Sequence, residues 1–299
     1  MKLNSFILIL FSISLFNGCQ LSGVDEENKA EENQFIQRNE QTEDTVNHNE
    51  KIDSLDQAKT LDDSTESLDE IEYDNGIIIK WISKGKGGKV ESNQMVNIDY
   101  RNSLENGAIY DGNHLIKKPY VPFFVGWNQQ TKGWDFALTK LREGDQVEVF
   151  LPAEWARGEK GIPGVVPPNA PNILYLDVKE ILEPTFVVDD IRIWRVEKGK
   201  KPNDSISFED ELAIHYFVSS ESNPRYDNSY ERGEPFQLTM GDGNIVPGLY
   251  KALHFGRKGD KLMIHIPAKE AYGSDGLKGL VQPNEDLFYD LIIVDHKNK

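Results

Sequence analysis

GIPGVVPP at residues 161–168 returns at residues 276–283 as GLKGLVQP, with Gly, Gly, Val and Pro in the same four places. Each stretch follows a Pro-Ala-x-x-Ala-x-Gly segment and precedes a run in which apolar and polar residues alternate. Glycine and proline at this density mark a loop between strands. The return of so specific a loop indicates that the chain contains two copies of one folded unit.

The repeat extends on both sides of this loop. A strand tyrosine, a Tyr-Asp pair and two further glycines recur in the same order. The shared positions lie 116 residues apart at the first tyrosine, 115 apart through the middle, and 113 apart where Asp177 is matched with Asp290. We therefore predict two domains of one fold, at residues 75–184 and 185–299, joined near Glu183 and Pro184.

Within each domain the alternating runs predict strands. They lie at residues 96–100, 147–150 and 174–178, and at residues 212–216, 262–266 and 288–294. One short helix follows the second shared glycine, at residues 134–141 and 249–255. The predicted fold class is α+β, with an antiparallel sheet wrapped on one short helix in each domain. His215 and His265 fall on strands, where we expect them to face outward, and the six histidines show no metal-ligand spacing.

The N-terminus has the layout of a bacterial export signal. Lys2 precedes a nearly continuous apolar run at residues 6–16, which is shorter than the roughly 20 residues that span a membrane. The run ends in Asn-Gly-Cys, and Cys19 is the only cysteine of the chain. This arrangement resembles a bacterial lipobox, which implies a signal peptide at residues 1–18 and a lipid on Cys19. The alternative is an ordinary cleaved signal followed by a chance cysteine.

The formal net charge is −17, and most of it lies near the N-terminus. Residues 20–74 hold 18 acidic and 4 basic side chains, with no proline and no tryptophan. Because such a segment buries too little apolar surface to offset its ordering entropy, we expect residues 19–74 to form a disordered tether. So acidic a chain is a poor candidate for binding nucleic acid. A single cysteine excludes a disulfide framework and cysteine-rich metal sites.

Both domains resemble FKBP-type peptidyl-prolyl cis-trans isomerases. The order of signals carries the resemblance: the strand tyrosine, the Tyr-Asp pair, a helix opened by Lys-Gly or Pro-Gly, the Pro-Ala-x-x-Ala-x-Gly segment and the Gly-x-x-Gly-x-Val-x-Pro loop. It covers about residues 76–298 and implies two FKBP-like domains, each a curved half-barrel around a short helix. It also implies an aromatic pocket that takes proline-containing segments of unfolded or partly folded polypeptides, with no cofactor and no metal.

In the second domain the resemblance assigns a complete pocket. Tyr272 donates its hydroxyl to the substrate, the backbone N–H of Val246 binds a substrate carbonyl, and Asp227 faces the pocket. The walls, rim, floor and far side of the pocket are Tyr216, Tyr226, Phe236, Ile245, Leu249, Val281 and Tyr289. Leu249 stands where the family usually has tryptophan, which makes the floor smaller but still apolar.

The first domain departs further from the family. The resemblance assigns its pocket to Tyr100, Tyr110, Asp111, Thr131, Trp134, Val166 and Leu176. However, Arg157 stands where the tyrosine hydroxyl is expected, Gln130 and Thr131 replace an aliphatic rim, and Val121 replaces a phenylalanine wall. We therefore expect the second domain to be the better isomerase. On the residues alone, Asp111 and Asp227 have an alternative reading as turn formers.

These observations lead to one function and two alternatives. The leading prediction is a peptidyl-prolyl cis-trans isomerase that assists protein folding in the bacterial cell envelope, anchored through lipidated Cys19. The alternatives are a binding or chaperone module without turnover and a structural envelope lipoprotein. Gln20 after the cysteine differs from the aspartate of an inner-membrane retention signal, so we expect the outer membrane, facing the periplasm. The acidic cluster at residues 25–27 resembles the export signals of some surface lipoproteins, which makes the cell surface the alternative location.

Overall fold

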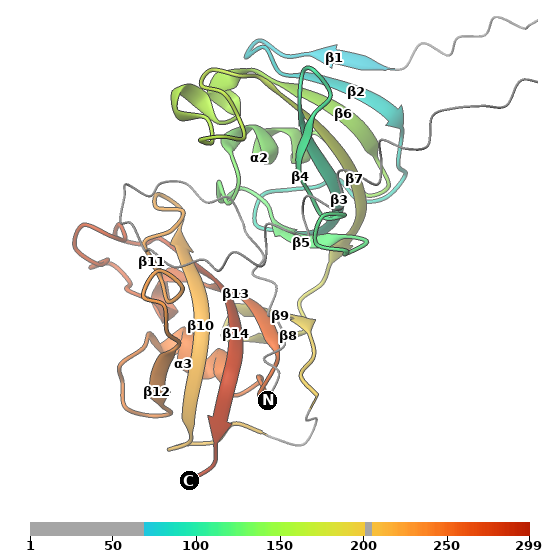
Figure 1. Ribbon diagram of the computed structural model, residues 1–299. Helices are drawn as coiled ribbons and strands as arrows, with labels where there is room; N and C mark the ends of the chain where they lie inside the picture. The colour runs from blue at the N-terminus through green and yellow to red at the C-terminus, as the bar shows by residue number, and fades with distance from the viewer. Residues whose placement is uncertain (1–68, 201–204) are drawn as a thin grey trace, which may run out of the picture. The chain divides into compact units, whose positions relative to one another are not determined.

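The computed structural model describes residues 69–200 and 205–299 (Figure 1). The predicted signal peptide, Cys19 and the tether up to residue 68 lie outside the described residues. Two β-sheets, each with one α-helix, make up the described part of the chain. The prediction of two α+β units in tandem is confirmed.

The first domain is a seven-stranded sheet in which every pairing is antiparallel. The strand order is β1-β2-β6-β7-β3-β4, and β5 pairs with β3 beside β4. Helix α2 follows β5, and two short 3-10 turns, η1 and η2, lie between β6 and β7. The bounds are β1 Glu70–Glu72, β2 Ile78–Ser83, β3 Met95–Leu104, β4 Ile109–Gly112, β5 Val121–Phe124, α2 Lys132–Leu138, β6 Gln146–Leu151, η1 Ala153–Trp155, η2 Gly158–Lys160 and β7 Asn172–Leu182.

The second domain repeats this topology. The strand order β11-β10-β14-β13-β9-β8, with β12 on β10, matches the first sheet strand for strand. Helix α3 takes the place of α2, and the 3-10 turn η3 takes the place of η1. The bounds are β8 Phe186–Val188, β9 Ile191–Glu197, β10 Glu211–Ser220, β11 Asp227–Asn228, β12 Phe236–Thr239, α3 Pro247–Leu253, β13 Lys261–Ile266, η3 Ala268–Glu270 and β14 Leu287–Lys297.

The strand registers correct one part of the predicted alignment between the repeats. Tyr100 pairs with Leu176, and its counterpart Tyr216 pairs with Leu291. The spacing therefore stays at 115 residues along β7 and β14, and the predicted match of Asp177 with Asp290 is wrong. The alignment failed here because the two strands are similar and each contains an aspartate, although the two aspartates occupy positions two residues apart.

The glycine–proline loop has the same conformation in both domains. The backbone N–H of Ile162 donates to the carbonyl of Val166 at 2.8 Å, and Leu277 donates to Val281 at 2.8 Å. Gly161 has φ +56°, and a Cβ there would lie 2.2 Å from the Val166 carbonyl oxygen. Only glycine meets both demands, the left-handed backbone and the close approach. This explains why the loop is the strongest signal of the fold in the sequence.

Each helix begins two residues before its predicted start. Thr131 and Val246 are the N-caps, and the helices end at Leu138 and Leu253, before the predicted ends at 141 and 255. The second shared glycine therefore lies inside the helix and does not precede it. A Cβ on Gly248 would lie 2.3 Å from the Cγ2 of Ile266, so the helix packs directly against the sheet at this point. Pro247 at the first helical position fits its fixed φ and missing N–H.

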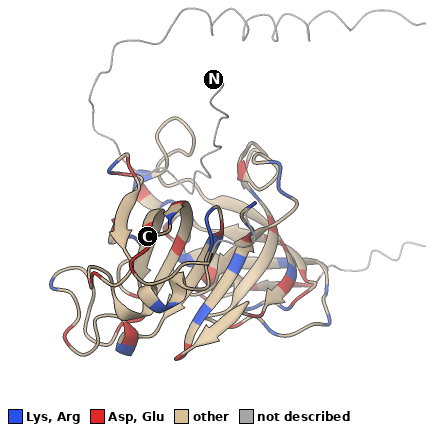
Figure 2. Cartoon of the chain, turned by 90° about the horizontal axis from the view of Figure 1, so that it is seen from below, with Lys and Arg blue, Asp and Glu red and all other residues tan. Residues whose placement is uncertain are grey.

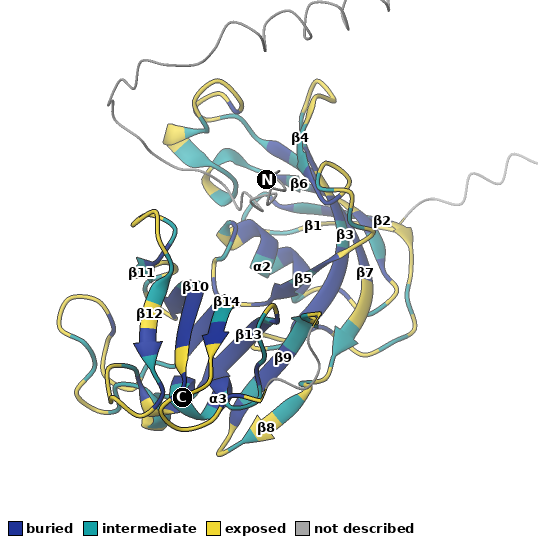
Figure 3. Cartoon of the chain, turned by 60° about the horizontal axis from the view of Figure 1, so that its bottom comes forward, coloured by how far each residue is buried: buried dark blue, intermediate teal, exposed yellow. Residues whose placement is uncertain are grey.

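Each domain has its own hydrophobic core between the concave face of the sheet and the helix. Figure 3 shows the central strands and the helices as largely buried, with exposure concentrated in the loops. The first core is built around Trp134 and Leu138 and the second around Leu249 and Leu253. The alternating strand residues supply the opposing surface, as the two-residue period predicts.

A third cluster lies on the other face of these strands and corrects the expectation for one histidine. It contains Met95, Phe124, Trp127, Trp194, Met263 and Phe288, and the rings of Phe124 and Phe288 stack at 4.3 Å. His265 was expected to face outward, but it is only 6% exposed because Phe124 and Trp127 cover it. His215 is half-buried on β10.

The first domain also begins earlier than predicted. Strand β1 pairs Glu70 with Lys80, so residues 70–72 belong to the sheet and not to the tether. The end of β7 at Leu182 and the start of β8 at Phe186 flank the predicted junction. Among the described residues, no helix is both long and apolar enough to cross a bilayer. In Figure 2, basic and acidic residues are interspersed along the described strands and loops.

Candidate functional site

The second domain encloses a cavity of about 480 Å³ between the sheet and the N-terminal end of α3. Nine of its lining residues are the ones predicted from the sequence: Tyr216, Tyr226, Asp227, Phe236, Ile245, Val246, Leu249, Tyr272 and Tyr289. They come from β10, β11, β12, α3, β14 and the connecting loops. Residues that lie up to 73 positions apart in the chain therefore meet in one concave site.

Val281 is the predicted residue that does not line this cavity. Its side chain is 3% exposed and belongs to the core of the second domain. Its backbone carbonyl closes the glycine–proline loop described above. The structure therefore places Val281 behind the cavity wall.

Six lining residues were missed by the sequence reasoning: Ile214, Val218, Gly243, Asn244, Pro247 and Ala271. Ile214 and Val218 lie two residues on either side of Tyr216 along β10. The two-residue period of a strand places them on the same face, so the sequence contained the signal for these two. The others flank predicted residues in loops, where no period applies.

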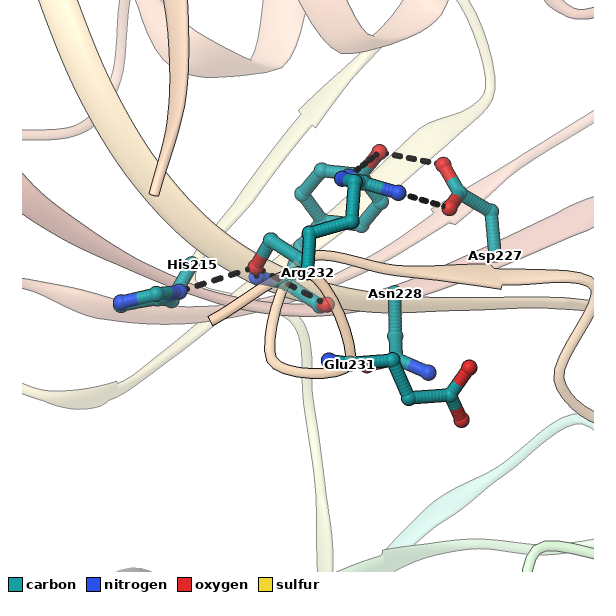
Figure 4. A network of polar contacts seen from close by, with 7 residues as sticks. His215, Asp227, Asn228, Glu231 and Arg232 are labelled. Atoms are coloured by element: carbon teal, nitrogen blue, oxygen red, sulfur yellow. Dashed lines mark hydrogen bonds and ion pairs between the residues drawn. The ribbon is translucent and has the colours of Figure 1, made fainter. Parts of the chain in front are cut away.

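A polar network joins two lining residues of this cavity, Tyr216 and Asp227, to Arg232 (Figure 4). The hydroxyl of Tyr216 donates to the carboxylate of Asp227, and Arg232 forms an ion pair with the same carboxylate. The second amine of Arg232 donates to the Tyr216 oxygen at 2.9 Å. Burial first, and then the bond to Asp227, raise the pKa of Tyr216 to about 12. Arg232 was not predicted, and no sequence signal pointed to it.

Local structure holds this network in place. The side-chain oxygen of Asn228 accepts from the backbone N–H of Glu231 at 2.8 Å, which turns the chain after β11 so that Arg232 reaches Asp227. Ser229 follows β11, and its hydroxyl accepts from the N–H of Tyr216 on β10 at 2.8 Å and lies 3.0 Å from Nδ1 of His215. Asp227 thus bonds to Tyr216 in the cavity wall and to Arg232. Its role is therefore more than that of a turn former, which was the alternative interpretation.

Three tyrosine hydroxyls lie close to one another in the cavity. Burial, followed by the nearby hydroxyls of Tyr289 and Tyr272, raises the pKa of Tyr226 well above its usual range. Burial, followed by the nearby Tyr272 hydroxyl, also raises the pKa of Tyr289. The hydroxyl oxygen of Tyr226 is buried and has no hydrogen-bond partner among the residues that the structure describes. The hydroxyls of Tyr226 and Tyr289 therefore stay protonated at neutral pH. A tyrosine hydroxyl can donate a hydrogen bond to a ligand.

The rim of the cavity offers a backbone donor. Val246 is the N-cap of α3, with φ −61° and ψ 147°. Within residues 69–200 and 205–299, its N–H donates to no protein acceptor. An N–H in this position suits the predicted contact with a substrate carbonyl, which stays a prediction.

The equivalent site of the first domain keeps the aromatic floor. Trp134 is 2% exposed, meets the Tyr100 ring edge-on at 4.9 Å and stacks on Phe123 at 5.5 Å. The Tyr100 hydroxyl donates to Asp111 at 3.1 Å, as Tyr216 does to Asp227. Burial raises the pKa of Asp111, although the bonds from Tyr100 and from the Gly112 amide oppose the rise.

The rim of this first site is polar and differs from its counterpart. Arg157 donates to the side-chain oxygen of Gln130 at 2.8 Å. The Tyr110 hydroxyl donates to Asn172 at 3.0 Å. The hydroxyl oxygen of Thr131 is buried and lacks a hydrogen-bond partner within the described residues. Asn172, a partner on β7, was not predicted.

The remaining predicted residues of the first site need one correction. The strand register shows that the residue equivalent to Tyr289 is Leu174 and not Leu176. Val149 pairs with Leu174 in the first domain, and its counterpart Ile264 pairs with Tyr289 in the second. Leu176 corresponds to Leu291, and both are fully buried in their cores. Val166 is 2% exposed and corresponds to Val281. Val121 pairs with Ile98 as Phe236 pairs with Ile214, which agrees with its predicted place in the wall.

The second site can hold an apolar ring and donate hydrogen bonds to carbonyl oxygens around it. The part of the chain that the structure describes contains no cluster of three or more His, Cys, Asp or Glu side chains able to hold a metal ion. Apolar walls with a few convergent polar groups are typical of binding sites for small groups and peptide segments.

Comparisons with known proteins agree with this geometry. The profile of the FKBP_C family, described as FKBP-type peptidyl-prolyl cis-trans isomerase, matches residues 86–179 and 203–294. The chain is 25% identical over 209 residues to "Peptidyl-prolyl cis-trans isomerase FKBP10" of Mus musculus, covering 70% of this chain and 35% of that protein. It is 27% identical over 209 residues to "Peptidyl-prolyl cis-trans isomerase FKBP9" of Homo sapiens, covering 70% and 36%. The chain thus spans about a third of the length of these relatives.

A shorter match and a solved structure complete the comparison. The chain is 35% identical over 105 residues to "FK506-binding protein 4" of Rhizopus delemar, covering 35% of this chain and 26% of that protein. The crystal structure of the three FKBP domains of wheat FKBP73 superposes with a TM-score of 0.39 at 21% identity, covering 76% of this chain and 97% of that chain. Because the family profile matches more than half of the sequence, and does so twice, the chain belongs to the FKBP-type peptidyl-prolyl cis-trans isomerases and carries two of their domains in tandem.

Proposed function

We propose that this protein is a peptidyl-prolyl cis-trans isomerase that acts on proline-containing segments of unfolded or partly folded proteins, and that its second domain carries most of the activity. The observation that supports this proposal is the cavity of the second domain. It combines apolar walls, a leucine floor, a backbone donor at Val246 and the hydroxyl of Tyr272. The proposal also draws on the chain's membership of the isomerase family.

The reaction needs no bond to be made or broken. An X-Pro amide crosses a barrier of about 18–20 kcal/mol because twisting the bond removes its resonance. A site accelerates the exchange when it binds the twisted amide more tightly than either planar form. The proline ring rests on Leu249 between the aromatic walls, and Val246 and Tyr272 hold the neighbouring carbonyl groups. Each tenfold gain in rate requires about 1.4 kcal/mol of preference for the twisted form.

A second role is supported for the first domain. Its floor and its Tyr100–Asp111 pair match the second domain, but its rim is occupied by Arg157 and Gln130, which are bonded to each other. A polar rim is hydrated and offers less apolar contact to a proline ring. We propose that this domain mainly holds substrate segments while the second domain isomerises them.

The proposed location rests on the N-terminal sequence. The apolar run, Gly18 and the single cysteine support acylation of Cys19. Two or more acyl chains give stable membrane anchoring, whereas a single chain gives only marginal binding. We propose an outer-membrane lipoprotein that faces the periplasm, with the cell surface as the alternative. The acidic segment that follows Cys19 then separates the folded domains from the bilayer.

The test is a refolding assay whose slow phase is limited by X-Pro isomerisation. The chain beginning at Gln20 is added in catalytic amounts, and the rate constant of the slow phase is measured. Acceleration proportional to enzyme concentration supports the isomerase. Suppressed aggregation without acceleration would favour the binding or chaperone alternative. Neither effect, with the protein folded by circular dichroism, would favour the structural alternative.

A further inference from the structure

Arg157 gives the first domain a charged group where the second domain has a neutral hydroxyl. Arg157 comes two residues after η1, as Tyr272 comes two residues after η3. The backbone N–H of Gly161 donates to the Arg157 carbonyl at 3.2 Å, as that of Gly276 donates to the Tyr272 carbonyl at 3.2 Å. Arg157 therefore occupies the place of Tyr272, and its guanidinium lies beside Gln130 at the rim of the first site. The residues Tyr100, Tyr110, Asp111 and Trp134 form the cup of this domain.

The groups bound to this guanidinium are neutral. One amine donates to the side-chain oxygen of Gln130 at 2.8 Å. The charge also opposes the rise in the pKa of the Tyr110 hydroxyl, which places that hydroxyl nearby. Among residues 69–200 and 205–299, no carboxylate forms an ion pair with Arg157. A guanidinium has five N–H donors, so several remain for a ligand.

The acidic side chain of the cup, Asp111, feels the charge of Arg157, which opposes the rise in its pKa, but no ion pair joins the two groups within the described residues. One oxygen of Asp111, Oδ1, accepts from the Tyr100 hydroxyl at 3.1 Å and from the Gly112 amide at 2.8 Å. In the second domain the matching Asp227 forms a direct ion pair with Arg232. Within the described residues of the first domain, Asp111 has no such ion pair, and the side chain of Arg157 is bonded to Gln130.

A second observation points to a polar ligand at the same rim. The Thr131 hydroxyl oxygen is buried beside Gln130 and has no hydrogen-bond partner in the described part of the chain. A buried polar atom without a partner costs free energy unless a ligand or water satisfies it. An apolar residue next to the proline does not satisfy it, whereas a carboxylate or amide does.

We propose that the cup of the first domain is selective for proline segments in which an acidic residue flanks the proline, with Arg157 binding the carboxylate. This inference rests on the proposed function, since it assumes that the cup takes proline segments. A planar guanidinium matches a carboxylate bidentately, and such charge-assisted bonds are about twice as strong as neutral ones. The second domain, with Tyr272 at this position, has no group that makes this distinction.

The experiment uses a signal that only the first cup provides. Trp134 is the floor of that cup, and the cavity of the second domain contains no tryptophan. The full chain is labelled with 5-fluorotryptophan, and the Trp134 resonance is assigned by its loss in Trp134→Phe. Amidated peptides of sequence Ala-Glu-Pro-Phe and Ala-Gln-Pro-Phe are titrated, with a second pair in which the Glu or Gln follows the proline.

We expect the Trp134 resonance to shift with a Kd about tenfold lower for the Glu peptide than for the Gln peptide in at least one pair, a ratio that falls with added salt. Arg157→Gln removes the difference, and Arg157→Lys keeps part of it because it keeps the charge. Arg101→Gln is the matched control, since Arg101 lies on the other face of β3 over the Tyr175 ring and its loss should leave the ratio unchanged.

Two results would overturn the inference, and they are distinct. Equal affinity for the Glu and Gln peptides, unaffected by Arg157→Gln, would show that the first cup binds proline segments without reading charge. If no peptide moves the Trp134 resonance while the full chain still catalyses isomerisation, the first domain is not a proline site and its role under the proposed function fails as well.

Discussion

Removing the Tyr272 hydroxyl should slow isomerisation without unfolding the second domain. Tyr272→Phe keeps the half-buried ring, which packs against the core, and deletes only the group that is proposed to donate to the substrate. A neutral hydrogen bond contributes about 0.5–1.5 kcal/mol net. At about 1.4 kcal/mol for each tenfold change, kcat/KM of the full chain should fall by about 2- to 13-fold. The free energy of unfolding should change by less than about 0.5 kcal/mol.

The assay measures kcat/KM of the full chain on a proline tetrapeptide whose cis form is followed spectroscopically. Tyr230→Phe is the matched control, because it removes a tyrosine hydroxyl of the same domain outside the cavity, where the ring stacks on Phe217 at 4.7 Å. Its activity should equal that of the parent chain.

Two outcomes would refute this reasoning. Unchanged kcat/KM in Tyr272→Phe would mean that the hydroxyl makes no contact in the transition state, or that the first domain carries the activity. Trp134→Ala distinguishes the two explanations, because it abolishes the activity of the full chain only if the first domain carries that activity. A loss above about 100-fold would exceed what one neutral hydrogen bond supplies and would mean that the substitution disturbs the whole cavity.

Three further predictions concern pH, stability and anchoring. The fold raises the pKa of Tyr216 to about 12, so its contribution to the free energy of unfolding is complete below pH 10 and is lost as the pH rises towards 12. In denaturant titrations Tyr216→Phe should remove about 2–3 kcal/mol of the pH dependence of stability in that range. Parallel stability curves of the variant and the parent chain would contradict this. Asp260→Ala should destabilise the second domain by about 3–5 kcal/mol in urea unfolding, because it leaves Arg195, whose side chain is 11% exposed, without its ion-pair partner; a loss under 1 kcal/mol would show that water replaces the carboxylate. Cys19→Ser should abolish incorporation of labelled palmitate and release the protein from membranes, and continued labelling would reject the lipobox interpretation.

The sequence was sufficient for the fold and for most of the second site because those features depend on residues with few substitutes. The loop at Gly161 requires a left-handed backbone in contact with a carbonyl, so glycine and its neighbours are repeated and visible. The aromatic walls come from strand positions with a two-residue period. Only the aromatic residues of this pattern were assigned to the site, so Ile214 and Val218, which lie on the same face of the strand, were missed.

Contacts between loops were beyond the reach of the sequence. Arg232 reaches Asp227 only because Asn228 turns the chain, and Arg157 meets Gln130 across 27 residues. No regular sequence spacing predicts either of these two contacts. The match of Asp177 with Asp290 failed for a related reason: two similar residues in similar strands outweighed the constant offset, which only the hydrogen-bond register makes visible. His265 was misplaced because a strand pattern shows which face a residue occupies but not what covers that face.

Because each helix packs directly on its sheet, the position of the helix does not depend on which side chains line the cup. At Gly133 a Cβ would lie 2.4 Å from the Trp155 carbonyl oxygen, and at Gly248 it would lie 2.3 Å from Ile266. Backbone contacts at these glycines therefore hold the helix, whether the next residue is Trp134 or Leu249. The two copies can consequently exchange floor and rim side chains on an unchanged scaffold, so that after duplication one copy can retain the reaction while the other acquires a different ligand preference.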